Sequence, residues 1–111
     1  MIARLVTLTA AVGVVMCSAG LAASEWSEPK THTVIIEEMR FQPEHLTVTR
    51  GDTIRWVNKD VVPHTATSEA GRFDSQTIET AKSWKFTART KGRFAYICSF
   101  HPTMKAMLNV K

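Results

Sequence analysis

Apolar and polar residues alternate with a period of two through most of the chain after residue 30. This is the pattern of β-strands that bury one face. The alternation is clearest from Ser83 to Thr87 and from Phe94 to Cys98, and glycines at 51 and 92 mark turns before two of the apolar stretches. Beyond the first 23 residues, no window of ten residues or more keeps a helical stripe.

The pattern therefore predicts an all-β protein. Many short strands with frequent turns are typical of a Greek-key β-sandwich, and we expect seven to eight strands with antiparallel pairing. The predicted strands cover residues 33–36, 46–49, 54–57, 83–87, 94–98 and 106–110.

The first 23 residues follow a different pattern. One basic residue, Arg4, precedes an apolar segment of twelve residues at 5–16, and a cleavage region rich in small residues follows at 20–23. This order is typical of a secretory signal peptide, and the apolar run is shorter than the roughly 20 residues that a membrane-spanning helix needs. We therefore expect residues 1–23 to be a signal peptide and residues 24–111 an exported, periplasmic domain that is not an integral membrane protein. An uncleaved anchor and a lipidated Cys17 are the alternatives.

Composition and charge narrow the class of protein further. With 111 residues, 44% of them hydrophobic and 22% charged, the chain is long enough for one globular domain. Its net charge of +4 is spread along the sequence without a basic run or an aromatic RNA-binding motif. A nucleic-acid partner is therefore not expected.

Cleavage of the signal peptide would leave Cys98 as the sole cysteine, so that no internal disulfide is possible. A small exported domain usually needs stabilisation beyond its core, and an unpaired thiol in an oxidising compartment needs an explanation. A bound metal ion would account for both.

Metal-binding residue types gather near the end of the chain. Cys98, His101 and Met104 follow one another at intervals of three residues, in a segment expected to be a loop because Pro102 prevents regular strand pairing. If Phe94 points into the sandwich, Cys98 points inward as well, because alternate residues of a strand share a face.

A fourth ligand is needed, and His64 is the best placed candidate because it lies where a loop turns into a strand. Two His, one Cys and a weak, distant Met form the ligand set of blue copper sites. Zinc accepts Cys and His but seldom a thioether. His32 and His45 lack such neighbours and are expected to be exposed. Met39 is expected to fill the core, and Met107 to serve packing or lie at the surface.

The segment from Cys98 to Met104, together with the upstream residues 60–65, resembles the ligand loops of the cupredoxins, the small blue copper proteins. Among them it is most similar to the amicyanins, which share the Cys-x-x-His-x-x-Met spacing, whereas plastocyanins have a longer His-to-Met interval. The resemblance implies one type 1 copper ion held by His64, Cys98, His101 and Met104. It also implies that the Thr65 amide donates to the Cys98 sulfur and that Asn58 ties its loop to Ser99.

The resemblance further implies a monomeric electron carrier, not an enzyme, with a dehydrogenase, cytochrome c or reductase as redox partner. A periplasmic copper carrier or storage protein is the alternative function. Use of Cys98 and His101 as nucleophile and base would require an oxyanion site and an orienting group, and would leave Met104 without a purpose. We expect partners to dock on an apolar patch around His101, with a basic rim drawn from Lys59, Lys105, Arg72 and Lys82.

Overall fold

The computed structural model describes residue 3, residues 9–15 and residues 28–111. The predicted signal peptide lies mostly outside these residues. Eight strands and no helix are present in the described part, and nothing helical there is long and apolar enough to cross a membrane. The strands are β1 (Thr31–Glu37), β2 (Arg40–Gln42), β3 (His45–Val48), β4 (Thr53–Asn58), β5 (Thr67–Ser68), β6 (Ser83–Thr87), β7 (Gly92–Cys98) and β8 (His101–Val110).

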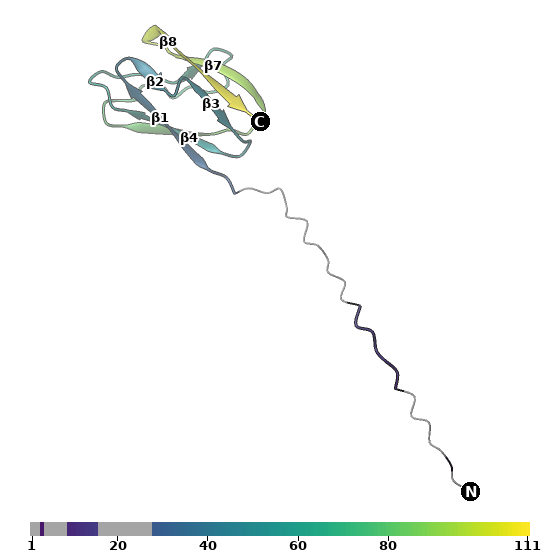
Figure 1. Cartoon of the computed structure of the whole chain (residues 1–111). Helices are drawn as coiled ribbons and strands as arrows, with labels where there is room; N and C mark the ends of the chain where they lie inside the picture. Colours follow the sequence, from purple (N-terminus) through teal and green to yellow (C-terminus); the bar gives the residue numbers. More distant parts are fainter. Residues whose placement is uncertain (1–2, 4–8, 16–27) are drawn as a thin grey trace.

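The strands form two four-stranded sheets that pack face to face as a sandwich (Figure 1). One sheet has the order β2-β1-β4-β6 and the other the order β3-β8-β7-β5. The prediction of an all-β sandwich with seven to eight strands is confirmed.

The expectation of purely antiparallel pairing is wrong for two pairs of strands. β1 runs parallel to β4, and β3 runs parallel to β8, while the other pairs are antiparallel. Alternation within a strand fixes which face is buried but does not encode which strand lies beside it or in which direction. The mixed sheets follow from chain crossovers between the two layers, which the pattern of single strands cannot reveal.

The core lies between the inward faces of the sheets. Trp56 of β4 is fully buried, and its ring centroid lies 5.6 Å from that of Tyr96 on β7, so that these aromatic rings join the two sheets. Trp84 of β6 is only partly buried, although its ring lies 5.5 Å from Trp56. Along β7, Phe94, Tyr96 and Cys98 share the inward face, as predicted.

The loop after Cys98 is shorter than the sequence predicts. β8 begins at His101, which pairs with Cys98, and only two residues separate β7 from β8. A register shift between Ile97 and Cys98 accommodates this tight connection. Pro102 lies in β8 with an exposed side chain, which is compatible with strand structure because proline removes only one backbone donor.

The other end of the sandwich is held by a buried carboxylate. Asp52 accepts hydrogen bonds from the backbone amides of Lys30 (2.9 Å) and Thr49 (3.0 Å) and contacts Nε2 of His32 at 2.8 Å. The Lys30 amide, the His32 ring and the Thr49 amide together lower the pKa of Asp52 from 3.8 to about 2, against the opposing effect of burial. His32 is thus partnered and half-buried, contrary to the expectation of an exposed ring.

Acid should weaken the fold through Asp52. Because its pKa is lowered by folding, the carboxylate contributes stability above about pH 4 and loses that contribution as the pH falls through about 2, for a total of about 2 kcal/mol. Asp52→Asn should therefore lower the free energy of unfolding at neutral pH by a similar amount and flatten its decline between these pH values. Urea unfolding at a series of pH values measures both effects.

Glu79→Gln is the matched control, because Glu79 is an exposed carboxylate. It should leave the stability within about 0.5 kcal/mol of the unmodified protein. If the free energy of unfolding of the Asp52→Asn variant still declined as steeply in acid as that of the unmodified protein, another carboxylate would be responsible for the decline.

Candidate metal centre

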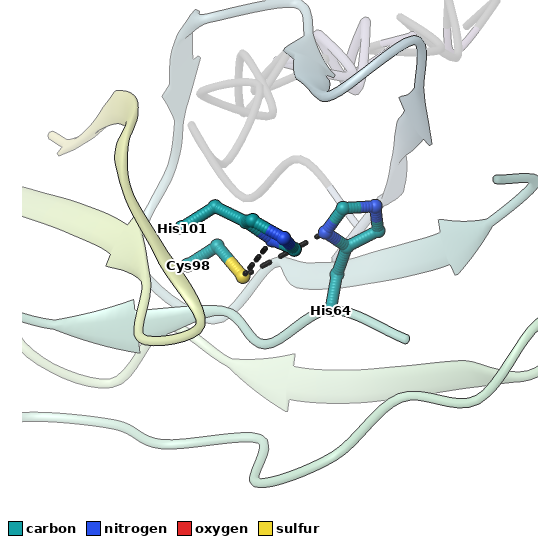
Figure 2. A group of neighbouring side chains, drawn as sticks. All are labelled: His64, Cys98 and His101. Carbon is teal, nitrogen blue, oxygen red and sulfur yellow. Dashed lines mark hydrogen bonds between the residues drawn. The ribbon is translucent and has the colours of Figure 1, made fainter. Parts of the chain in front are cut away.

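Three side chains with metal-binding atoms converge at the end of the sandwich where β4 and β7 finish and β8 begins (Figure 2). Sγ of Cys98 lies 3.7 Å from Nδ1 of His64 and 3.7 Å from Nδ1 of His101. The ligand atoms of these residues all lie within 4.8 Å of one another. The structure therefore brings together three of the four residues that the sequence singled out, although they come from two segments 34 residues apart.

The three donors differ in their access to solvent. His64 and Cys98 are fully buried, whereas His101 is partly exposed. The ring centroids of the two histidines are 5.3 Å apart, and both rings turn the same nitrogen, Nδ1, toward the sulfur (Figure 2). His101 thus forms the boundary between this buried cluster and the surface.

Met104 lies three residues into β8, and its side chain is 4% exposed. It shares the inward face of β8 with Ala106 and Leu108, the face that also lines the core. Met107 lies on the opposite face of β8, where it pairs with His45 of β3 and is only partly buried. Of these two methionines, Met104 alone faces the side of the sheet on which Cys98 is buried.

The two ligand segments are joined through Thr65. Its backbone amide donates to Sγ of Cys98 at 3.3 Å, as predicted. Its hydroxyl oxygen accepts a hydrogen bond from the Ser99 amide at 2.8 Å and lies 3.0 Å from the Ser99 hydroxyl. The residues that follow His64 and Cys98 in the sequence are therefore bonded directly to each other.

The role expected of Asn58 is wrong. Its side-chain amide donates to the carbonyl oxygens of Val62 and Ile78, both at 2.9 Å, and its side-chain oxygen accepts the Asp60 amide. Asn58 therefore shapes the loop that leads to His64, whereas the tie to Ser99 comes from Thr65. Asn58 and Thr65 are both small polar residues near the site, and the sequence alone does not show which of them contacts Ser99.

Asp60 is the functional residue that the sequence analysis missed. Its Oδ2 lies 2.7 Å from Nε2 of His64. A carboxylate can only accept, so that Nε2 of the neutral ring carries the proton and Nδ1 keeps a lone pair directed at the cluster. The i,i+4 spacing of Asp60 and His64 was the available signal, but an acidic residue in a polar loop is normally solvated.

Asp60 also holds the turn between β1 and β2. The amides of Glu38 and Met39 donate to its two oxygens at 2.9 and 3.0 Å. Burial raises the pKa of Asp60, but the Met39 amide, His64 and the Glu38 amide outweigh this effect and lower the pKa below its ordinary value. Met39 is 40% exposed at this turn, so the expectation that it fills the core is wrong.

The donor set of this cluster fits a particular metal chemistry. One thiolate and two imidazoles, with a buried thioether on the adjacent strand, suit copper, because the sulfur ligands favour Cu(I) and imidazole binds both oxidation states. A structural zinc site usually closes with a further Cys or His. The other described histidines, His32 and His45, lie outside the cluster. The sandwich and its His-Cys-His cluster together define a protein of the blue copper type.

Comparison with known proteins supports this class. The chain belongs to the cupredoxin family, since the family model described as the cupredoxin-like domain matches residues 7–110. It is similar to amicyanin from Paracoccus versutus, with 27% identity over 81 residues that cover 68% of this chain and 61% of the relative. The chain thus matches about three fifths of that relative's length.

Solved structures show the same fold. An oxidised mutant of amicyanin has a TM-score of 0.69 and 26% identity, covering 73% of this chain and 82% of that one. A copper-containing nitrite reductase from Thermus scotoductus has a TM-score of 0.70 and 28% identity. That similarity covers 77% of this chain but only 23% of the reductase, so it is confined to one domain-sized part of the enzyme.

Removal of the Asp60 carboxylate should loosen the metal centre. Asp60→Ala leaves the buried Nε2 of His64 without its acceptor and frees the ring to turn. We expect the affinity for copper to fall by about 10- to 100-fold, as for other partners of metal-bound histidines. Competition with a chelator of known affinity measures this loss.

Glu69→Ala is the control, since Glu69 is an exposed carboxylate outside the hydrogen bonds of Asp60 and Thr65. Equal affinities of the Asp60 and Glu69 variants would show that the contact to His64 does not hold the ring.

Proposed function

We propose that this protein is a periplasmic electron carrier that holds one type 1 copper ion through His64, Cys98, His101 and Met104. The observation that carries the proposal is the convergence of one sulfur and two Nδ1 atoms at a buried strand end. Bound copper supplies one-electron chemistry by cycling between Cu(II) and Cu(I).

The protein's part in this function is to keep the donors in place. The Thr65 amide supplies a hydrogen-bond donor to the Cys98 sulfur, and the Asp60 carboxylate fixes the His64 ring. These hydrogen bonds hold the donors from the protein side, so little rearrangement is needed when the charge of the site changes. Donors to the sulfur also withdraw electron density from it, which tunes the reduction potential.

The same arrangement argues for a carrier and against an enzyme. Two of the three clustered donors are fully buried, and His101 alone reaches toward solvent. A substrate would therefore meet the edge of one imidazole, whereas an electron needs no direct access to the metal. The likeness to amicyanin supports this proposal.

A partner surface surrounds His101. Phe100 is 50% exposed beside it, and Val61 (91% exposed) and Val62 lie in the loop before His64. Met39 lies next to this loop, because its amide bonds to Asp60. An apolar patch of this kind suits a transient complex with a dehydrogenase, cytochrome c or reductase.

Charged residues surround part of this patch. Lys59 follows the end of β4, and Lys105 pairs with Ile97 one residue before Cys98, so both lie near the cluster and are exposed. Arg72 instead lines a cleft with Val110 at the end of β8, which is the opposite end of the molecule. The basic rim therefore includes Lys59 and Lys105 but not Arg72.

The first test of the proposal is the colour of the copper-loaded protein. A thiolate ligand should make the oxidised form intensely blue, and Cys98→Ser should abolish the colour while the sandwich remains folded. Visible absorption and circular dichroism measure the two properties. A colourless Cu(II) form of the unmodified protein would contradict the ligand assignment.

Met104 and Met107 form a matched pair for testing the fourth ligand. Met104→Gln should retain copper and lower the reduction potential, because an oxygen donor favours Cu(II) more than a thioether does. Met107→Gln lies on the other face of β8 and should leave the potential unchanged. Voltammetry measures both, and a shift in the Met107 variant alone would reverse the assignment.

The basic rim predicts that the rate of electron transfer to an anionic partner depends on the salt concentration. Electron transfer to the anionic oxidant hexacyanoferrate(III) should slow as ionic strength rises, and the double variant Lys59→Glu, Lys105→Glu should slow it about tenfold at low salt. The same charge change in Lys91→Glu, Lys111→Glu, at the other end of the sandwich, should have a much smaller effect. Stopped-flow measurement of the loss of reduced protein gives the rates. Equal slowing by the two double variants would show that the basic rim does not attract the oxidant.

A further inference from the structure

A cleft of about 380 Å³ opens at the end of the sandwich opposite the metal centre. It lies between the edge strand β6 and the first residues of β7. β5 is too short to close it, because its two residues pair only with Tyr96 and Ile97 and leave the beginning of β7 uncovered on that side. The cleft therefore results from the unequal lengths of β5 and β7.

The floor of the cleft is apolar and mostly aromatic. It is lined by Phe73, Phe86 and Phe94 together with the buried residues Ala88 and Val110. The rings of Phe73 and Phe86 lie with their centroids 4.8 Å apart, whereas Phe94 comes from the opposite sheet. The planar faces and edges of such rings favour a ligand that carries a ring of its own.

The rim of the cleft is cationic. Arg72, Lys85 and Arg89 line it with exposed side chains, and its lining includes no acidic residue. This imbalance extends beyond the cleft, because all ten Asp and Glu residues of the chain precede residue 80. A positive rim above an apolar floor suits a ligand that is anionic at one end and flat and apolar at the other.

We propose that this cleft is a second ligand site, which binds a small aromatic carboxylate. The ring would lie against the phenylalanines, and the carboxylate would meet Arg89 and Arg72, whose guanidinium groups match its geometry. The volume lies within the range of small-molecule sites. Phe94 and Cys98 are four residues apart along β7, about 13 Å, so the ligand would not touch the metal-binding residues.

The experiment titrates the reduced, copper-loaded protein with 1-naphthoate. Two-dimensional NMR follows the backbone amides, and calorimetry gives the dissociation constant. We expect saturable shifts at Ala88 and Phe94, and binding at least tenfold weaker for the neutral analogue 1-naphthylmethanol, which keeps the ring but lacks the charge. The copper spectrum should not change, so that failure of this proposal and failure of the electron-carrier proposal remain distinguishable.

Two arginine variants test the rim. Arg89→Gln should weaken 1-naphthoate binding about tenfold. Arg93→Gln removes the same charge from an exposed residue that lies outside the cleft and should leave the binding unchanged. Phe86→Leu should weaken the binding of 1-naphthoate and of 1-naphthylmethanol alike, because it alters the apolar floor of the cleft and not the charge of its rim.

The proposal would be overturned by equal affinity for the acid and the alcohol, by equal weakening in the Arg89 and Arg93 variants, or by the absence of a saturable shift up to about 10 mM. Shifts confined to Phe100 and the residues around His101 would also overturn it, since they would place the acid at the metal end.

Discussion

The bond between the two ligand segments at Thr65 is the interaction on which the metal centre depends. Thr65 is 2% exposed, and its hydroxyl contacts Ser99 and Thr67 while its amide donates to the Cys98 sulfur. Because His64 lies in a loop and Cys98 ends β7, 34 residues further along the sequence, the covalent chain alone does not keep them together. A buried threonine whose amide and hydroxyl are both hydrogen-bonded supplies that constraint and holds the two ligand segments side by side.

Three polar residues around the site each fix a different part of the position of the metal-binding side chains. Thr65 fixes the separation of the two ligand segments, Asn58 shapes the loop before His64, and Asp60 sets the direction of the His64 ring. Each bonds mainly to backbone groups or to a ligand, and none is itself placed in the cluster. The distant cleft beside β6 shares none of these residues, which allows its chemistry to vary without disturbing the metal centre.

Much of the fold could be predicted from alternation, because a strand with one buried face repeats every second residue. The inward direction of Cys98 followed from Phe94 on the same strand, and the spacing to His101 and Met104 identified the chemistry. The sequence could not reveal the parallel pairing of β1 with β4, or that Asp60 bonds to His64, since both depend on which loops and strands meet in space. His32 was misplaced for the same reason, as its partner Asp52 lies 20 residues away.

The central claim is that the protein holds His64, Cys98 and His101 in one arrangement for both charge states of the metal. X-ray absorption spectroscopy of the copper-loaded protein at neutral pH tests it most directly. The account predicts one short sulfur contact and two nitrogen contacts in the oxidised form, and the same three contacts, little changed in length, after reduction. Loss of the sulfur contact in either state, or replacement of an imidazole by water at neutral pH, would contradict it.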